Sequence, residues 1–306
     1  MSVVQVEEIT KTFGKTKAVN NVSFNIEKGR IFGLLGPNGA GKTTTLRMMN
    51  HILTPDSGFI TINGQAAGPE TQKMIGYLPE ERGLYKKMKV EEQLMYLTQL
   101  KGMSHSGAKS AIHYWLERFN ASDWKKKEIG ELSKGMSQKI QFIATIAHNP
   151  DIYIFDEPFS GLDPINSETL KEIIIELKEQ GKTILFSTHR MEQVEQMCDD
   201  ICLFNRGKAV LQGKLREIKA AYGKNTINLE FEGDGSFLDK LEAVRINNRS
   251  TNFAEIRVLN GQNMQNILKF AMEHAEIHKF ERVEPSLHEI FISTVGEDNL
   301  NQVEAA

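Results

Sequence analysis

Short apolar runs alternate with amphipathic stretches over the first two thirds of the chain. Val3–Val6 and Val22–Ile26 are predicted strands, and the uniformly apolar Ile31–Leu35 predicts a buried strand. A helix is predicted from Lys42 through Met49. Strands that alternate with helices in this way are typical of an α/β domain.

Residues from about 83 to 148 read mainly as helix, which predicts a helical subdomain within the α/β domain. Its predicted helices are Val90–Lys101, Ser106–Phe119 and Ser137–Ala147. Beyond it, the amphipathic helix Ser167–Glu179 lies among three predicted buried strands. These strands are Ile152–Phe155, Thr183–Ser187 and Ile201–Phe204.

The pattern changes after about Leu215, where two rounds of strand then helix predict a small α+β domain. The predicted segments are Thr226–Phe231, Phe237–Ala243, Glu255–Leu259, Met264–Ala275, the strand Ile277–Val283 and a short helix starting near Pro285. We expect domains at residues 1–218 and 226–306, with a flexible connection around Tyr222–Asn225.

Composition narrows the class of protein. Hydrophobic residues make up 40% of the 306 residues and charged residues 25%, which is ordinary for a globular protein. A net charge of -3 gives no basic footprint for nucleic acid. Cys198 and Cys202 form no disulfide framework or zinc pattern and read as small apolar side chains. No run approaches the roughly 18 apolar residues of a membrane helix, so we expect a cytoplasmic location and membrane contact only through a partner.

A glycine-rich segment directly after the strand Ile31–Leu35 matches the phosphate-binding pattern G-x-x-x-x-G-K-[ST]. Its residues are Gly36, Pro37, Asn38, Gly39, Ala40, Gly41, Lys42 and Thr43, followed by Thr44. In such a loop, backbone N–H groups at a helix N-terminus point at phosphate oxygens. Lys42 would neutralise the phosphates of ATP, and the Thr43 hydroxyl would ligate Mg²⁺.

Two acids end the apolar strand Ile152–Phe155. Asp156 suits a Mg²⁺ contact, and Glu157 suits polarising the attacking water. An acid pair at a strand end is often only solvated, but together with the phosphate loop it indicates nucleotide hydrolysis.

Further motifs follow in an order that resembles the ATP-binding subunits of ABC transporters, over about the first 215 residues. The segment 132–136, Leu-Ser-Lys-Gly-Met, resembles the family signature, and 160–163, Ser-Gly-Leu-Asp, resembles its D-loop. His189 resembles the switch histidine, and Phe13 resembles the aromatic residue that stacks on adenine. The resemblance implies a P-loop NTPase cassette with a helical subdomain.

The resemblance also implies a head-to-tail pair of subunits with ATP between them. The phosphate loop would come from one subunit, while Ser133 and Gly135 would reach the γ-phosphate from the other. His189 would contact the γ-phosphate, and Asp163 would lie at the same interface. The implied partners are a second ATP-binding subunit and a separate multi-span permease, which would place the chain on the cytoplasmic face of the membrane.

Two positions depart from the family pattern. Glu80 stands where the family usually has a glutamine that senses Mg²⁺ and water, and Lys134 and Met136 replace glycine and glutamine in the signature. Glu80 is still an oxygen ligand for Mg²⁺ but adds negative charge. We hypothesise that Lys134 offsets this charge. Strictly additive activity losses on reverting both residues would exclude that coupling.

Similar substitutions occur in subunits that resemble bacterial sodium, drug and antibiotic exporters, which often carry a C-terminal domain ending like 284–291 here. By the same resemblance, Arg82–Met88 would contact the membrane partner, although a solvated charge run is an equal reading of Lys86–Lys89.

The alternative function is a soluble ABC ATPase that acts on ribosomes or DNA. Such proteins usually carry two cassettes in one chain or a long coiled-coil insertion, and this sequence has neither. A third hypothesis, a non-enzymatic regulatory subunit, would require loss of the catalytic acid, but Glu157 is present. The C-terminal domain could serve dimer contact, regulation or stability alone.

Overall fold

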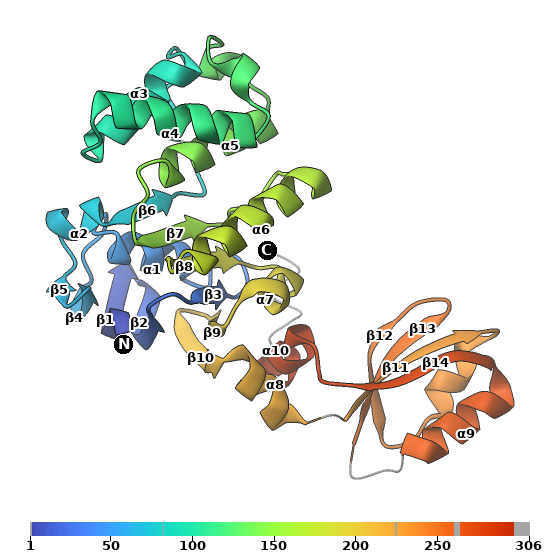
Figure 1. Ribbon diagram of the computed structural model, residues 1–306. Coiled ribbons are helices and arrows are strands. Elements are labelled where there is room, and N and C mark those ends of the chain that lie inside the picture. Colours follow the sequence, from blue (N-terminus) through green and yellow to red (C-terminus); the bar gives the residue numbers. More distant parts are fainter. Residues whose placement is uncertain (1, 82, 224, 260–263, 297–306) are drawn as a thin grey trace. The chain divides into compact units, whose positions relative to one another are not determined.

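The computed structural model describes residues 2–81, 83–223, 225–259 and 264–296 (Figure 1). The chain forms two compact units, residues 1–213 and 214–306, which are described separately. This grouping differs by a few residues from the domains expected from the sequence, because helix α8 (Leu215–Tyr222) belongs to the second unit.

A six-stranded sheet forms the centre of the first unit. Its strand order is β10 (Lys208–Lys214), β9 (Asp200–Asn205), β3 (Ile31–Leu35), β8 (Thr183–Thr188), β7 (Ile152–Asp156) and β6 (Ile75–Leu78). The pairs from β9 to β6 are parallel, with Leu35 beside Thr188 and Asp156 beside Ser187. Parallel strands bring their carboxyl ends to one edge, so the segments that follow β3, β6, β7 and β8 meet there.

A second, antiparallel sheet packs on the first. It has the order β2 (Thr16–Glu27), β1 (Ser2–Phe13), β4 (Ser57–Ile62) and β5 (Gln65–Ala66). Helix α1 (Lys42–Met49) lies between the two sheets, as Figure 1 shows. Its Leu46 and Met49 share one buried cluster with side chains of both sheets, such as Phe24 and Phe204. The phosphate loop that precedes α1 is therefore held on two sides by packed apolar surface.

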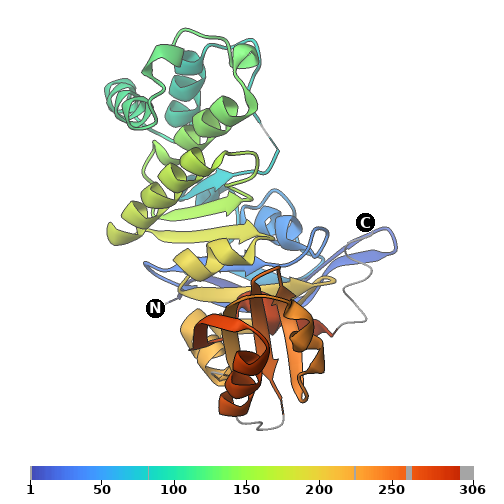
Figure 2. The same cartoon turned by 90° about the vertical axis from the view of Figure 1, so that its right-hand side faces the viewer.

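The residues between β6 and β7 form the helical subdomain that the sequence predicts. Its helices α3 (Val90–Leu100), α4 (His105–Arg118) and α5 (Lys134–Ile146) group at one end of the first unit in both views (Figures 1 and 2). A chain of aromatic rings joins α5 to the sheet. Ring centroids are 5.9 Å apart for Phe119 and Phe142, and 5.1 Å apart for Phe142 and Phe155.

The remaining helices of the first unit are α2 (Pro69–Lys73), α6 (Pro164–Glu179) and α7 (Met191–Met197). Cys198 and Cys202 are free and buried, which confirms their reading as small apolar side chains. Burial raises the pKa of the Cys198 thiol well above its usual range. Among the described residues, no helix combines the length and apolar character that crossing a bilayer requires.

The second unit has its own four-stranded antiparallel sheet, in the order β12 (Val244–Arg249), β13 (Phe253–Val258), β11 (Thr226–Glu232) and β14 (Glu276–Val283). Helix α9 (Met264–His274) covers one face through Ile267 and Ala271. Helix α10 (Leu287–Val295) starts with Ser286 as its N-cap. Its buried Glu289 accepts hydrogen bonds from Thr226 at 2.9 Å and Arg257 at 3.1 Å.

Candidate functional site

The phosphate loop has a backbone that only glycine fits at two positions. Gly36 has φ of 148°, and a Cβ there would lie 2.3 Å from the Phe204 carbonyl oxygen. Gly41 has φ of 106°, and its Cβ would lie 2.4 Å from the Ala18 carbonyl oxygen. The loop therefore curls tightly between β3 and α1, which starts at Lys42. This curl directs the free N–H groups at the start of α1 toward a bound anion.

Lys42 is almost fully buried in this loop. Its ammonium donates to the carbonyl oxygens of Gly36 at 2.7 Å and Pro37 at 3.1 Å, and lies 4.0 Å from Glu157 Oε1. Burial lowers the pKa of Lys42, while the neighbouring carboxylates Glu157 and Asp156 oppose this shift. A cation held beneath the loop in this way can neutralise phosphate oxygens bound above it.

Asp156 ends β7 and is 1% exposed. Its Oδ1 accepts hydrogen bonds from Ser187 and, at 3.2 Å, from Thr43, while its Oδ2 is buried without a partner. Burial raises the pKa of Asp156, and the hydrogen bonds from Ser187 and Thr43 lower it. A buried, unpaired carboxylate oxygen beside the Thr43 hydroxyl fits Mg²⁺, which needs few protein ligands when phosphates supply the others. The described residues hold no group of three or more His, Cys, Asp or Glu side chains arranged for a metal.

Glu157 follows Asp156 with a left-handed backbone, φ 49°. Its N–H donates to the backbone carbonyl of Ser187 at 3.2 Å and to the Ser187 hydroxyl at 3.1 Å. These bonds fix the turn, so the carboxylate stays near Lys42. His189 Nδ1 lies 3.0 Å from Glu157 Oε1. A carboxylate held between an ammonium and an imidazole is suited to accept or direct a proton of water.

Glu80, in the segment after β6, also belongs to this site. Burial raises its pKa, and the negative charges of Asp156 and Glu157 raise it further, while Lys42 opposes them. Glu80 is thus close enough to the other charged groups to interact with them electrostatically. Three carboxylates and one ammonium make the site acidic, a condition under which a divalent cation stabilises bound phosphates.

The signature and D-loop residues lie elsewhere in the same unit. Ser133 is the N-cap of α5 and accepts a hydrogen bond from the Met136 N–H, while a Cβ on Gly135 would meet open space. Asp163 caps α6 through the Asn166 N–H at 3.0 Å, which lowers the pKa of Asp163. No interaction described for this single chain joins Ser133, Gly135 or Asp163 to the phosphate loop.

Lys134 of the signature and Phe13 of β1 are two further residues that the sequence pattern assigns to the site. The Lys134 side chain lies over Gly161, where a Cβ would come 2.6 Å from Lys134 Cε. The proposed charge compensation between Lys134 and Glu80 stays a prediction. Phe13, at the end of β1, is 49% exposed, with Lys11 Nζ 5.9 Å from its ring centroid. An exposed ring at this place leaves a face free for stacking.

Sequence reasoning missed two residues that shape the site. The sequence pattern places Ser187 only in a strand, yet its side chain and backbone hold both Asp156 and Glu157. Its position next to Thr188 and His189, at a carboxyl end of a parallel strand, is the available signal. Gln141 falls within an ordinary predicted helix, yet its amide contacts the segment that carries Glu80.

Known proteins are similar to this chain in sequence and in fold. Residues 19–160 match the family model "ABC transporter", and residues 213–295 match the "ATP-binding protein DrrA1-3-like, C-terminal domain". The uncharacterised ABC transporter ATP-binding protein YhaQ of Bacillus subtilis is 47% identical, over 96% of this chain and 99% of its own length. The Nod factor export ATP-binding protein I of Burkholderia orbicola is 32% identical, over 79% of this chain and 82% of its own.

Solved structures of ABC transporter ATP-binding subunits have a similar fold. A structure described as the ATP-binding subunit of an ABC transporter has a TM-score of 0.68 and 31% identity, covering 72% of this chain and 94% of its own. Fold and site together define an ATP-hydrolysing P-loop cassette. The chain belongs to the family of ABC transporter ATP-binding subunits, which confirms the resemblance inferred from its motifs.

Proposed function

We propose that this chain is the motor subunit of an exporter, in which ATP closes a head-to-tail dimer and hydrolysis reopens it. The observation that carries this proposal is the joint position of Lys42, Asp156, Glu157 and His189 at one sheet edge. Ser133 and Gly135, at the start of α5, have no described hydrogen bond or ion pair with the residues of that edge, which supports a site completed by a second subunit. Closure and reopening would drive a conformational change in a separate membrane-spanning partner.

Each side chain has a proposed role. The phosphate loop and Lys42 bind the phosphates of ATP, Thr43 and Asp156 would hold Mg²⁺, and Phe13 would stack on adenine. Mg²⁺ would supply charge neutralisation at the phosphates. Glu157 would take the proton of the attacking water, with its carboxylate oriented by His189.

Two further assignments complete the proposed site. Glu80 would direct the water or a Mg²⁺ ligand at the phosphate edge. Ser133, Gly135 and Asp163 would face the nucleotide across the subunit interface, from the second ATP-binding chain.

Export is supported by the relative named for Nod factor export. A multi-span membrane permease would be the partner and would hold the chain at the cytoplasmic face of the membrane. Arg82, the first residue expected to contact that partner, lies outside the described residues.

Affinity purification of the tagged chain from gently solubilised native membranes tests this proposal. We expect a stoichiometric multi-span membrane protein to co-purify, and its identity would narrow the exported substrate. Recovery from the soluble fraction alone, with ribosomes, DNA or no partner, would contradict the transporter assignment and favour a soluble ABC-class ATPase.

A further inference from the structure

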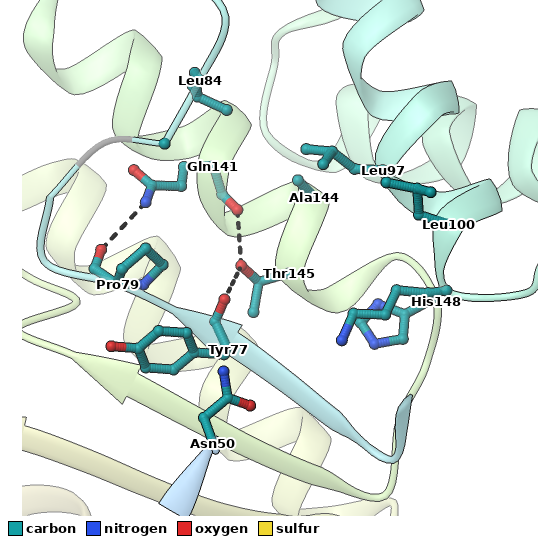
Figure 3. A pocket seen from close by; sticks show the side chains of 12 residues that line it. Asn50, Tyr77, Pro79, Leu84, Leu97, Leu100, Gln141, Ala144, Thr145 and His148 are labelled. Atoms are coloured by element: carbon teal, nitrogen blue, oxygen red, sulfur yellow. Dashed lines mark hydrogen bonds between the residues drawn. The ribbon is translucent and has the colours of Figure 1, made fainter. Parts of the chain in front are cut away.

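Gln141 is a buried polar residue in the middle of α5 that contacts both sides of Glu80. Its side-chain N–H₂ donates to the carbonyl oxygen of Pro79 at 3.1 Å and to that of Glu81 at 3.3 Å. Figure 3 shows the amide directed at Pro79 from the α5 side of a cavity of about 290 Å³. The two residues that flank Glu80 are thus attached to one side chain, which restricts the backbone that carries the Glu80 carboxylate.

The same helix has a second contact with this segment. One turn after Gln141, the Thr145 hydroxyl donates to the Gln141 carbonyl at 2.9 Å and lies 3.4 Å from the Tyr77 carbonyl oxygen (Figure 3). The end of β6 and the residues after it are therefore attached to α5 and should move together with it. Because the signature residue Ser133 is the N-cap of α5, the orientation of α5 affects both the signature and the segment that carries Glu80.

The amide group of Gln141 has a specific role at this position. The side chain is 4% exposed, and its N–H₂ group donates hydrogen bonds to the carbonyl oxygens of residues 79 and 81. An apolar side chain of the same shape would leave these two carbonyl oxygens without the Gln141 donor. The two donated hydrogen bonds are therefore what the amide supplies.

We propose that Gln141 is a positioning residue for Glu80, which fixes the Glu80 backbone opposite Asp156 and Glu157 and links its position to the orientation of α5. This inference rests on the proposed role of Glu80 in hydrolysis. In this proposal the Gln141 side chain acts through the carbonyl groups of Pro79 and Glu81 and not on the phosphates or the reacting water.

Gln141→Met tests the inference, because methionine has nearly the same shape and no donors. Gln72→Met is a matched control: the Gln72 amide also donates to two backbone carbonyls, of Asn50 at 2.9 Å and His51 at 3.4 Å, at the end of α1. In the full-length chain, we expect Gln141→Met to lower kcat roughly tenfold and to raise the Mg²⁺ concentration for half-maximal rate, since small displacements of positioned groups are costly. The KM for ATP should stay within about twofold, and Gln72→Met should match wild type in rate and Mg²⁺ dependence.

A double-mutant cycle with Glu80→Ala distinguishes the inference from its premise. If Gln141 acts through Glu80, Gln141→Met added to Glu80→Ala lowers kcat no further than about twofold. The inference would be overturned if the kcat of the double variant fell by the product of the two single losses. It would also be overturned if Gln141→Met and Gln72→Met had equal effects. Either result would leave the role of Glu80 intact. An unchanged rate and Mg²⁺ dependence in Glu80→Ala itself would refute the premise, and the role of Gln141 with it.

Discussion

At the scale of single residues, the site combines one buried ammonium group with three carboxyl groups that interact with it electrostatically. Lys42 interacts with Glu157, Asp156 and Glu80, and each of these acids opposes the effect of burial on the pKa of Lys42. The Asp156 and Glu80 carboxyls both have raised pKa values, mainly because of burial. Such a site repels the phosphates of ATP unless a cation accompanies them. The roles of the acids can therefore be separated by neutral substitutions of the same shape.

Glu157→Gln keeps the shape of the side chain and removes its charge. We expect the rate of ATP hydrolysis to fall by about 10²–10⁴-fold, because an amide cannot accept the proton of water. ATP affinity should be unchanged or higher, since one negative charge near the phosphates is lost. Turnover and equilibrium ATP binding measure the two effects, and a variant with more than a tenth of the wild-type rate would contradict the role of Glu157.

His148 predicts a pH-dependent stability. Both of its ring nitrogens are buried, and burial together with the positive charge of Lys101 lowers the pKa of its imidazole to about 4. The unfolded chain, with an ordinary pKa near 6.5, therefore binds the proton first, and acid favours unfolding. This contribution is complete above pH of about 6.5 and is lost as the pH falls toward 4. Allowing for partial exposure of the residue, we estimate about 2 kcal/mol.

Melting temperatures of the full-length chain between pH 7.5 and about 4 measure this effect. His148→Leu should lose less stability on acidification than wild type, and His105→Leu, which changes an exposed helix residue, should follow wild type. Parallel curves for His148→Leu and wild type would exclude the burial of a neutral imidazole as the cause.

At the scale of elements, glycines with a left-handed backbone are needed for different reasons in the phosphate loop and in a surface turn. Gly41 and Gly64 both have positive φ, 106° and 77°, but a Cβ clashes with backbone only at Gly41. Gly64→Ala should therefore cost about 1 kcal/mol, the strain of a left-handed residue. Gly41→Ala should cost more, about 2–4 kcal/mol, because the Ala18 strand must also shift.

ATP binding separates the two glycine variants further. Gly41→Ala should weaken ATP binding more than tenfold, since the displaced backbone N–H groups no longer converge on the phosphates. Gly64→Ala lies in the turn between β4 and β5 and should bind ATP as wild type does. Thermal unfolding and equilibrium ATP binding give both quantities, and equal effects of the two variants would show that the clash at Gly41 is relieved without cost.

Elements with a uniform or strongly periodic apolar pattern could be predicted from the sequence. Ile31–Leu35 and Lys42–Met49 have the predicted bounds. The predicted helix Phe237–Ala243 is wrong: residues Gly235–Lys240 form a 3₁₀ helix. There Phe237 and Leu238 are buried, and Ala243 adopts a left-handed φ of 52° that turns the chain into β12. Local apolar pattern does not encode that reversal, because tertiary packing decides it.

Two elements with exposed faces are not predicted, or only in part. Strand β10 is mostly exposed, and β1 extends to Phe13 past the polar residues that follow Val6, because β2 and β4 pair with it. For the candidate site, the phosphate loop and the acids of β7 were identified from sequence. The contact of Gln141 with Pro79 and Glu81 joins residues about 60 positions apart, and no local pattern indicates it.

At the scale of the whole molecule, the two units have separate cores. The buried cluster of residues such as Val4, Phe32 and Phe204 lies in the first unit, and the cluster of Ile227, Phe231 and others lies in the second. Every residue of the candidate site belongs to the first unit. A unit with its own core can fold by itself, so we expect the nucleotide site to keep its internal geometry without the second unit.

A chain ending at Gly213 should therefore keep its ATP affinity within about threefold of the full-length value, since it retains the phosphate loop and its packing. A loss beyond tenfold in a folded truncation would mean that the second unit shapes the site. The same samples, carrying Glu157→Gln so that ATP persists, test the open role of the second unit by sedimentation. ATP-dependent dimerisation that survives truncation would exclude a dimer-contact role, whereas monomers that still bind ATP would assign that role to residues 214–306.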